Sequence, residues 1–154
     1  MADEVLSYDE STKDLYLDLF TEIAIIEHLV RQRFEPALLA DLAAADFRVL
    51  NHFVRLDKAT EKLKTLAWCF QVEISAMRAT VSALAARRFL EVDWVDGHEC
   101  VFLTEAGRAK HAEAVADMAP DILEIMSEFK LGDLKITATT LREIRRTFDN
   151  LPDR

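Results

Sequence analysis

The feature of this sequence that most constrains its fold is an Asp-Gly pair between two short runs of β-branched and aromatic residues. The first run covers 89–95, the second covers 99–103, and Asp96-Gly97 lies between them. A two-residue hairpin turn requires positive φ angles, which Asp and Gly tolerate. We therefore expect a two-stranded antiparallel hairpin here. Only three glycines and three prolines occur in 154 residues, which favours long helices in the rest of the chain.

Upstream of the hairpin, apolar residues recur every three or four positions. This spacing predicts four helices, at 13–34, 43–56, 59–70 and 75–88. We expect Pro36 to interrupt the chain after the first helix. Thr60 and Ser75 are the residue types that cap helix N-termini, so they are expected to cap the third and fourth helices.

Downstream of the hairpin, Thr104 and Glu105 predict the N-terminus of a fifth helix. Gly132 is expected to end that helix, and Thr139 or Thr140 to open a sixth. The fifth helix is expected to carry an apolar stripe of Ala106, Ala109, Ala112, Val115 and Met118, which continues beyond a possible kink at Pro120 with Ile122, Ile125 and Phe129.

Three compact helices followed directly by a hairpin form the winged helix–turn–helix arrangement. The sequence therefore predicts one domain over 1–154 of mainly α class (α+β), with about six helices and a two-stranded wing. Residues 41–104 are expected to form the winged lobe. Helices within 12–40 and 105–150 carry more apolar surface than the lobe needs, which predicts a dimer interface built by both ends of the chain.

Charge is unevenly distributed along the chain. The net charge is −9, but residues 47–90 carry eight basic and three acidic residues, or +5, which leaves −14 for the remainder. DNA binding requires cations that neutralise phosphates, and residues 47–90 supply them in one continuous stretch.

Other classes of protein have little support in the sequence. No glycine-rich phosphate loop or nucleophile elbow is present, so we do not expect an enzyme. No apolar run approaches the roughly 20 residues that span a bilayer. Cys69 and Cys100 cannot form a disulfide framework and are interpreted as reduced thiols of a cytoplasmic protein. The four histidines do not have the spacing of metal ligands: His28, His52, His98 and His111. We therefore expect neither a metal nor a cofactor.

Three segments resemble the MarR family of bacterial regulators: DFRVLNHFVRL at 46–56, LAWCFQVEISAMRATVSALAARRFLEV at 66–92 and FLTEAGRAKHAEAV at 102–115. The resemblance covers roughly residues 12–150, and its most specific part is LTEAGR at 103–108. It implies a homodimer in which each winged lobe places a recognition helix in the major groove. Such proteins usually repress a neighbouring operon, and many release DNA when a small phenolic ligand or an oxidant arrives.

Two positions depart from that family. Arg88 stands where the family usually has a glycine after the recognition helix, so this residue must adopt an uncommon backbone conformation or the turn must relax. The family's wing usually carries an Asp-any-Arg pattern, whereas residues 91–99 here contain four acids and no lysine or arginine. Carboxylates near phosphates would be repelled, so recognition would rest on the helix at about 75–88.

In that helix, Met77, Val81 and Leu84 share the face expected to meet the core. The opposite face carries Arg78, whose guanidinium can bind guanine bidentately. Ser75 and Ser82 can bond to phosphates or base edges, and Ala79 can meet a thymine methyl. Contacts with the phosphate backbone are predicted for Arg87, Arg88, Lys62 and Lys64. The alternative is an ordinary amphipathic helix whose basic residues are only surface charges.

The sequence thus predicts a bacterial, cytoplasmic, homodimeric repressor of transcription. Its expected partners are double-stranded operator DNA, a second copy of the chain and a small-molecule effector. No association with a membrane is expected. The alternative function is a winged-helix dimer that acts on another regulator through protein–protein contacts. The acidic wing, the alanine-rich face of the helix at 75–88 and the overall charge motivate that alternative.

Overall fold

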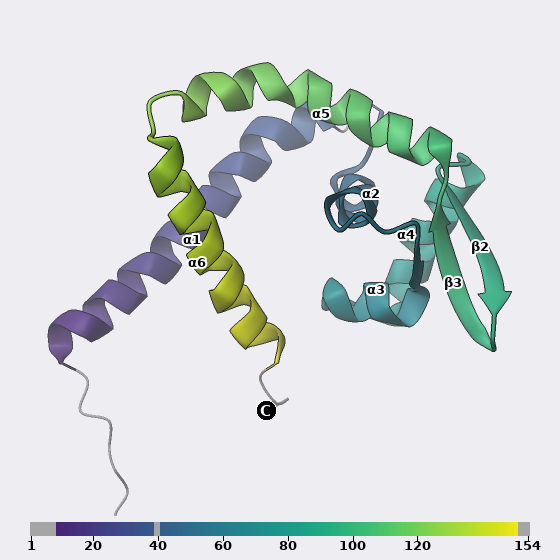
Figure 1. Cartoon of the computed structure of the whole chain (residues 1–154), viewed down its shortest axis with the longest axis horizontal. Helices are drawn as coiled ribbons and strands as arrows, with labels where there is room; N and C mark the ends of the chain where they lie inside the picture. The colour runs from purple at the N-terminus through teal and green to yellow at the C-terminus, as the bar shows by residue number, and fades with distance from the viewer. Residues whose placement is uncertain (1–8, 39–40, 151–154) are drawn as a thin grey trace, which may run out of the picture.

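The computed structural model describes residues 9–38 and 41–150. Within these ranges the chain forms six helices and one small sheet (Figure 1). The elements are α1 (Glu10–Leu38), α2 (Ala44–Arg55), β1 (Thr60–Lys62), α3 (Leu63–Cys69), α4 (Ile74–Ala86), β2 (Leu90–Val95), β3 (His98–Leu103), α5 (Glu105–Met126) and α6 (Leu131–Asp149). The predicted class, a mainly helical winged helix–turn–helix, is confirmed.

The hairpin forms where the Asp-Gly pair predicts it. β2 and β3 pair antiparallel from Leu90 opposite Leu103 to Val95 opposite His98. Asp96 and Gly97 have φ angles of 51° and 75°, so both occupy the left-handed region that a tight two-residue turn requires.

A third strand extends this sheet and was not expected. β1 pairs antiparallel with β3, Thr60 opposite Phe102 and Lys62 opposite Cys100, which gives the strand order β1-β3-β2. The prediction of a helix from residue 59 with Thr60 as its cap is therefore wrong, because α3 begins at Leu63. The partner of β1 lies about 40 positions away, and local periodicity does not reveal such pairing.

The core of the winged lobe lies between α2, α3, α4 and the sheet. Met77, Val81 and Leu84 of α4 are buried, as their spacing predicts. Side chains that are completely or almost completely buried come from every element of the lobe except β1, and they include Leu50, Phe53, Leu63, Leu66, Leu84, Leu90 and Val101. This packing holds α4 in place and leaves its other face to solvent.

Helix α5 packs on the lobe through a face that is largely separate from its apolar stripe. Its buried residues are Gly107, His111, Ala114 and Met118. Of the apolar stripe that the sequence places on this helix, only Met118 is buried. Exposed are Ala106, Ala109, Ala112, Val115, Ile122 and Ile125, and also Phe129, which lies beyond the end of α5. The buried face includes a glycine and a histidine, which an apolar pattern does not count, and alanine is too small to mark a face.

Several helix boundaries differ from the predictions. α1 continues through Pro36 to Leu38, because a proline in the last turn removes only one backbone N–H donor. α6 begins at Leu131, so Gly132 lies inside it, and the Thr139 and Thr140 hydroxyls donate to carbonyls one turn earlier. Ser75 is likewise inside α4, whose N-cap position is occupied by Glu73.

The remaining helices extend away from the lobe. α5 runs from the wing to α6, and α6 crosses α1 (Figure 1). Phe20 and Phe148 meet edge to face at 5.8 Å between ring centroids, and Arg33 pairs with Asp121 at 2.8 Å. Among the described residues, no helix combines the length and the apolar character that a bilayer span requires.

Candidate nucleic-acid interface

The α3–turn–α4 unit presents one face of α4 to solvent. The turn is closed by Gln71, whose φ of 53° is left-handed, and by the Val72 amide, which donates to the Ala67 carbonyl at 3.0 Å. With its apolar face in the core, α4 exposes the four residues that the sequence predicts for base reading: Ser75, Arg78, Ala79 and Ser82. The structure therefore brings these four together on one surface.

Arg78 is held by a carboxylate of the wing. Its Nη2 donates to Glu99 Oε2 at 2.8 Å, and its Nε lies 3.4 Å from Glu99 Oε1. The hydrogen bond from Arg78 lowers the pKa of Glu99, and the same bond raises the pKa of Arg78, so both groups stay charged. Sequence reasoning treated Glu99 only as one of four wing acids, because nothing local signals a contact across 21 positions.

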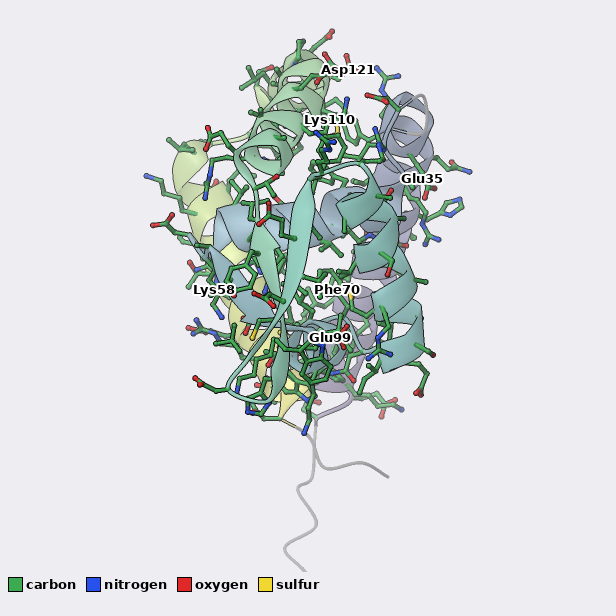
Figure 2. All side chains as sticks on the ribbon, turned by 90° about the vertical axis from the view of Figure 1, so that its right-hand side faces the viewer. Glu35, Lys58, Phe70, Glu99, Lys110 and Asp121 are labelled. Carbon is green, nitrogen blue, oxygen red and sulfur yellow. The ribbon has the colours of Figure 1, made fainter. Side chains whose placement is uncertain are left out.

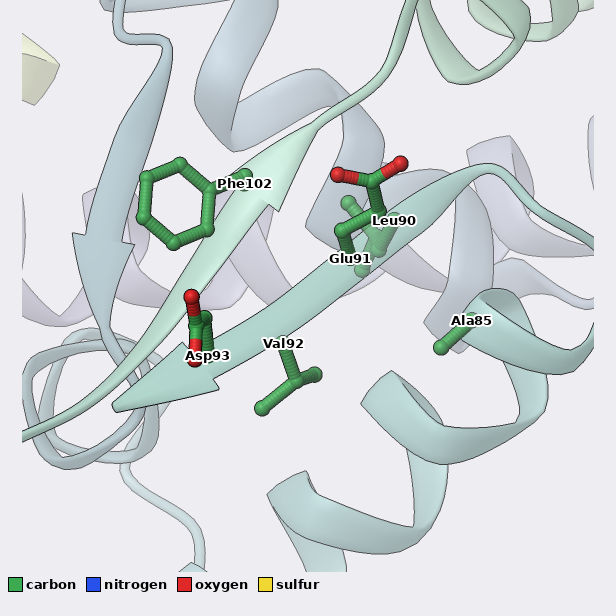
Figure 3. A pocket seen from close by; sticks show the side chains of 6 residues that line it. All are labelled: Ala85, Leu90, Glu91, Val92, Asp93 and Phe102. Atoms are coloured by element: carbon green, nitrogen blue, oxygen red, sulfur yellow. The ribbon is translucent and has the colours of Figure 1, made fainter. Parts of the chain in front are cut away.

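The other wing acids lie on the surface of the hairpin, where the Asp93 carboxylate accepts the Trp94 amide at 2.8 Å. Glu91, Asp93 and Asp96 are exposed. Glu91 and Asp93 project from one side of β2 and line a shallow, open depression together with Ala85, Leu90, Val92 and Phe102 (Figure 3). No cation lines this depression, so the wing surface carries negative charge where the resembled family usually has an arginine.

Two predicted phosphate-contacting lysines flank the start of α3. Lys62 ends β1 and Lys64 is the second residue of α3, and both are exposed. Within the described part of the chain neither has an ion-pair partner, whereas Lys58 nearby is paired with Glu61. Lys62 and Lys64 are therefore available to bind an anion.

Arg87, also predicted to contact phosphate, is engaged within the lobe. Its Nη1 donates to the Asp41 carbonyl at 2.8 Å, its Nη2 donates to Asp41 Oδ1 at 3.1 Å, and its guanidinium lies 4.7 Å from the centre of the Phe89 ring. Asp41 also binds Lys110 of α5. Figure 2 shows Lys110 and Glu99 toward opposite ends of the lobe. Arg87 thus belongs to the junction with α5, away from Arg78.

Arg88 adopts the uncommon backbone conformation that its glycine-type position requires, with a φ of 64°. The Thr104 hydroxyl lies 2.7 Å from the Arg88 carbonyl oxygen and 3.0 Å from that of Phe89, and it accepts the Gly107 amide at 3.0 Å. This confirms Thr104 as the cap of α5. A Cβ at position 107 would lie 2.1 Å from the Phe89 carbonyl oxygen, so only glycine fits there. The LTEAGR segment thus fixes the turn after α4.

Two buried histidines and Cys69 form neither a metal site nor a reactive thiol in the described part of the chain. His111 is buried, stacks on Phe47 and lies 3.0 Å from the side-chain oxygen of Asn51. His52 is buried with its Nε2 3.8 Å from Glu61. Burial also raises the pKa of the Cys69 thiol, which disfavours a reactive thiolate. Across residues 9–38 and 41–150, no three potential ligands gather as a metal site.

No family model and no curated protein matches this sequence. Solved structures do match. The regulator BldR from Sulfolobus solfataricus shares 22% identity at a TM-score of 0.72, over 90% of this chain and 99% of that one. A MarR-family regulator from Silicibacter pomeroyi shares 19% identity at a TM-score of 0.73, over 96% of this chain and 99% of that one. An organohalide-sensing regulator bound to 2,4-dichlorophenol shares 17% identity at a TM-score of 0.68, over 97% of this chain and 90% of that one. The chain therefore has the winged-helix fold of the MarR-family transcriptional regulators.

Proposed function

We propose that this protein is a DNA-binding transcriptional regulator of the MarR type, whose helix α4 enters the major groove. The observation that carries the proposal is the exposed face of α4, where Arg78 projects between small residues on a winged-helix scaffold. The structural neighbours, which are transcriptional regulators, support the same conclusion.

Each residue of the surface then has a chemical role. Arg78 donates to a guanine edge, Ser75 and Ser82 bond to phosphates or base edges, and Ala79 meets a thymine methyl. Lys62, Lys64 and Arg88 neutralise phosphates. Arg87 would have to leave Asp41 to do so, and we assign it to the junction between α4 and α5. The acidic wing stays out of the minor groove, because its carboxylates repel the phosphates that line it.

The active form in this proposal is a homodimer, with residues 41–104 as the DNA-binding lobe and the helices within 12–40 and 105–150 as the interface. Residues 39 and 40 lie outside the described residues. None of the residues of α6, all of them described, is buried. Monomers rarely expose large apolar patches, and these helices expose many large side chains, including Leu15, Ile26, Leu123, Phe129, Leu131 and Ile136.

The dimer would act in the cytoplasm as a repressor. Its two copies of α4 would face half-sites about one helical turn, or roughly 34 Å, apart. A small-molecule effector is a further proposed partner, because one protein of this fold is an organohalide sensor solved with 2,4-dichlorophenol bound. We assign no enzymatic activity and no cofactor to the chain.

Selection of bound duplexes from a fragment library of the source genome tests the proposal. Full-length protein is mixed with the fragments, and the retained DNA is sequenced. We expect enrichment of a palindromic site with half-sites about 10 base pairs apart. Arg78→Ala protein should fail to enrich that site. The opposite result is a wild-type protein that enriches no sequence, even at low salt, and retains a partner protein from an extract of the source cells. In that case the alternative function through protein contacts replaces this one.

A further inference from the structure

Glu99 holds one edge of the Arg78 guanidinium and leaves the other edge free. An arginine carries five N–H donors in a rigid planar fork. The Glu99 carboxylate faces the Nε and Nη2 side of that fork. The two Nη1 donors and the second Nη2 donor remain. One Nη1 donor and this second Nη2 donor form the terminal edge, with which arginine can bind the O6 and N7 atoms of guanine.

The exposure of the two partners shows which of them faces solvent. The Arg78 side chain is 51% exposed, whereas that of Glu99 is only 19% exposed. The carboxylate therefore lies mostly covered, while the guanidinium remains open to solvent. A carboxylate in this arrangement is neutralised by its own arginine, unlike the exposed wing acids Glu91, Asp93 and Asp96.

The side chain of Arg78 is oriented by the wing and not by its neighbours on α4. Ser75, Ala79 and Ser82 are too short to brace a guanidinium. In the described part of the chain, Glu99 is its hydrogen-bond partner, and it comes from β3, which is paired along its full length with β2. A rigid hairpin thus supports a long, flexible side chain of the recognition helix. Fixing that side chain before binding removes part of the entropy cost of contacting a base.

We propose that Glu99 is a specificity-determining positioning residue, which orients Arg78 so that the free edge of its guanidinium meets a guanine in the major groove. The inference rests on the proposed function and deepens it. It also gives the wing a role that needs no contact with DNA, since the wing would act on recognition through Arg78. The competing role for the same contact is inhibition, in which Glu99 keeps Arg78 from the base.

Binding to a panel of duplexes separates these roles. The panel consists of the selected site and its single base-pair replacements, and dissociation constants are measured by fluorescence anisotropy. Wild-type protein should prefer one guanine by about 5- to 150-fold. Arg78→Ala should lose that preference. Glu99→Gln has the same size but loses the negative charge and one of the two acceptor oxygens, and its amide NH2 cannot accept from the guanidinium. It should therefore lose most of the preference at that base pair alone.

A matched control isolates positioning from charge. Asp93→Asn removes one negative charge from the same hairpin, at a residue that does not contact Arg78. It should bind every duplex slightly more tightly and keep the full preference for guanine. The double variant Arg78→Ala/Glu99→Gln should discriminate no worse than Arg78→Ala, because both changes remove one shared interaction. Urea midpoints of all variants show whether the hairpin is intact, and Glu99→Ala provides a second change at the same position.

Three results would overturn the inference. If Glu99→Gln and Glu99→Ala bind the selected site more tightly and keep the preference, Glu99 competes with DNA for Arg78. If both variants match wild type at every base pair, the contact has no part in recognition, while the proposed function stands. A wild-type protein without any preference among the duplexes would instead contradict the proposed function and this inference together.

Discussion

Three residues at the turn between α4 and β2 determine how α4 is held. Arg88 supplies a left-handed backbone conformation. The Thr104 hydroxyl lies within hydrogen-bond distance of the Arg88 and Phe89 carbonyl oxygens. Gly107 lets α5 approach the Phe89 carbonyl. The motif that carries the family resemblance is thus explained by local geometry. Its threonine and glycine are needed to place α4, whatever the lobe binds.

Gly107→Ala should destabilise the protein by about 1–3 kcal/mol, because the added methyl would overlap a backbone oxygen that cannot move independently. Gly132→Ala is the matched control. It also lies in a helix, but a Cβ there would meet nothing within 4 Å, so its free energy of unfolding should be unchanged or slightly higher. Urea denaturation of both variants measures the difference. Equal stability of the two would contradict the packing described for Gly107.

Arg88→Gly should be more stable than Arg88→Ala by about 1 kcal/mol, because glycine adopts the left-handed conformation without the steric cost that a Cβ carries. Both variants remove the same charge, so they should weaken DNA binding equally. The comparison therefore separates backbone strain from electrostatics. Should Arg88→Ala prove the more stable of the two, the turn is not strained at this residue.

Periodicity and capping rules predict some elements better than others. Asp96-Gly97 and the threonine cap of α5 follow from rules that act within a few residues, and both were predicted. β1 forms because it pairs with β3, and the buried face of α5 is selected by α2, so neither could be inferred locally. The same limit applies to the candidate site. The exposed face of α4 follows from its periodicity, but the Arg78–Glu99 and Arg87–Asp41 contacts depend on the tertiary fold.

Two buried histidines join elements of the lobe, which predicts a pH dependence of stability. His52 of α2 lies near Glu61 of β1, and His111 of α5 contacts Asn51 of α2. Burial lowers the pKa of both histidines below the usual value of 6.5. Below that pH the unfolded chain binds more protons than the folded one. The stabilisation is therefore complete above pH 6.5 and is lost as the pH falls toward the folded-state pKa values.

Urea unfolding at pH 7.5 and pH 5.5 tests this dependence. The free energy of unfolding should be lower at pH 5.5, with each histidine contributing at most about 1.4 kcal/mol per pH unit. His111→Gln should reduce the difference between the two pH values. A wild-type protein that is equally or more stable at pH 5.5 would contradict the neutral, buried state assigned to these residues.

At the scale of the whole molecule, the distribution of apolar surface separates two regions. Nearly all of the buried large apolar side chains belong to the lobe, although Trp68 and Trp94 of the lobe are exposed, whereas α1, the C-terminal part of α5 and α6 expose most of theirs. Such a surface on a chain of this size favours association with a second copy, and twofold dimers are the commonest form of association. In the proposed function such a dimer would double the contacts with a palindromic site, because each copy would contribute one α4.

Sedimentation equilibrium should therefore show a dimer at micromolar concentration. Ile136→Glu places a charge on the exposed face of α6, where the isoleucine is 68% exposed, and should shift the protein toward monomer. Val95→Glu makes the same change at an exposed position of the wing and should leave the dimer intact. Dimers of equal strength for both variants would place the interface elsewhere.

The central claim is that α4 reads DNA through Arg78, and a salt titration of binding tests it most directly. Fluorescence anisotropy measures dissociation constants of wild type and Arg78→Ala for the selected site and for a scrambled duplex of the same composition. We predict nanomolar or tighter wild-type binding to the selected site, weakening steeply as salt rises. Arg78→Ala should weaken binding to that site by about 5- to 150-fold and bind the two duplexes alike. Equal affinity of wild type for both duplexes, or no binding at low salt, would contradict the account.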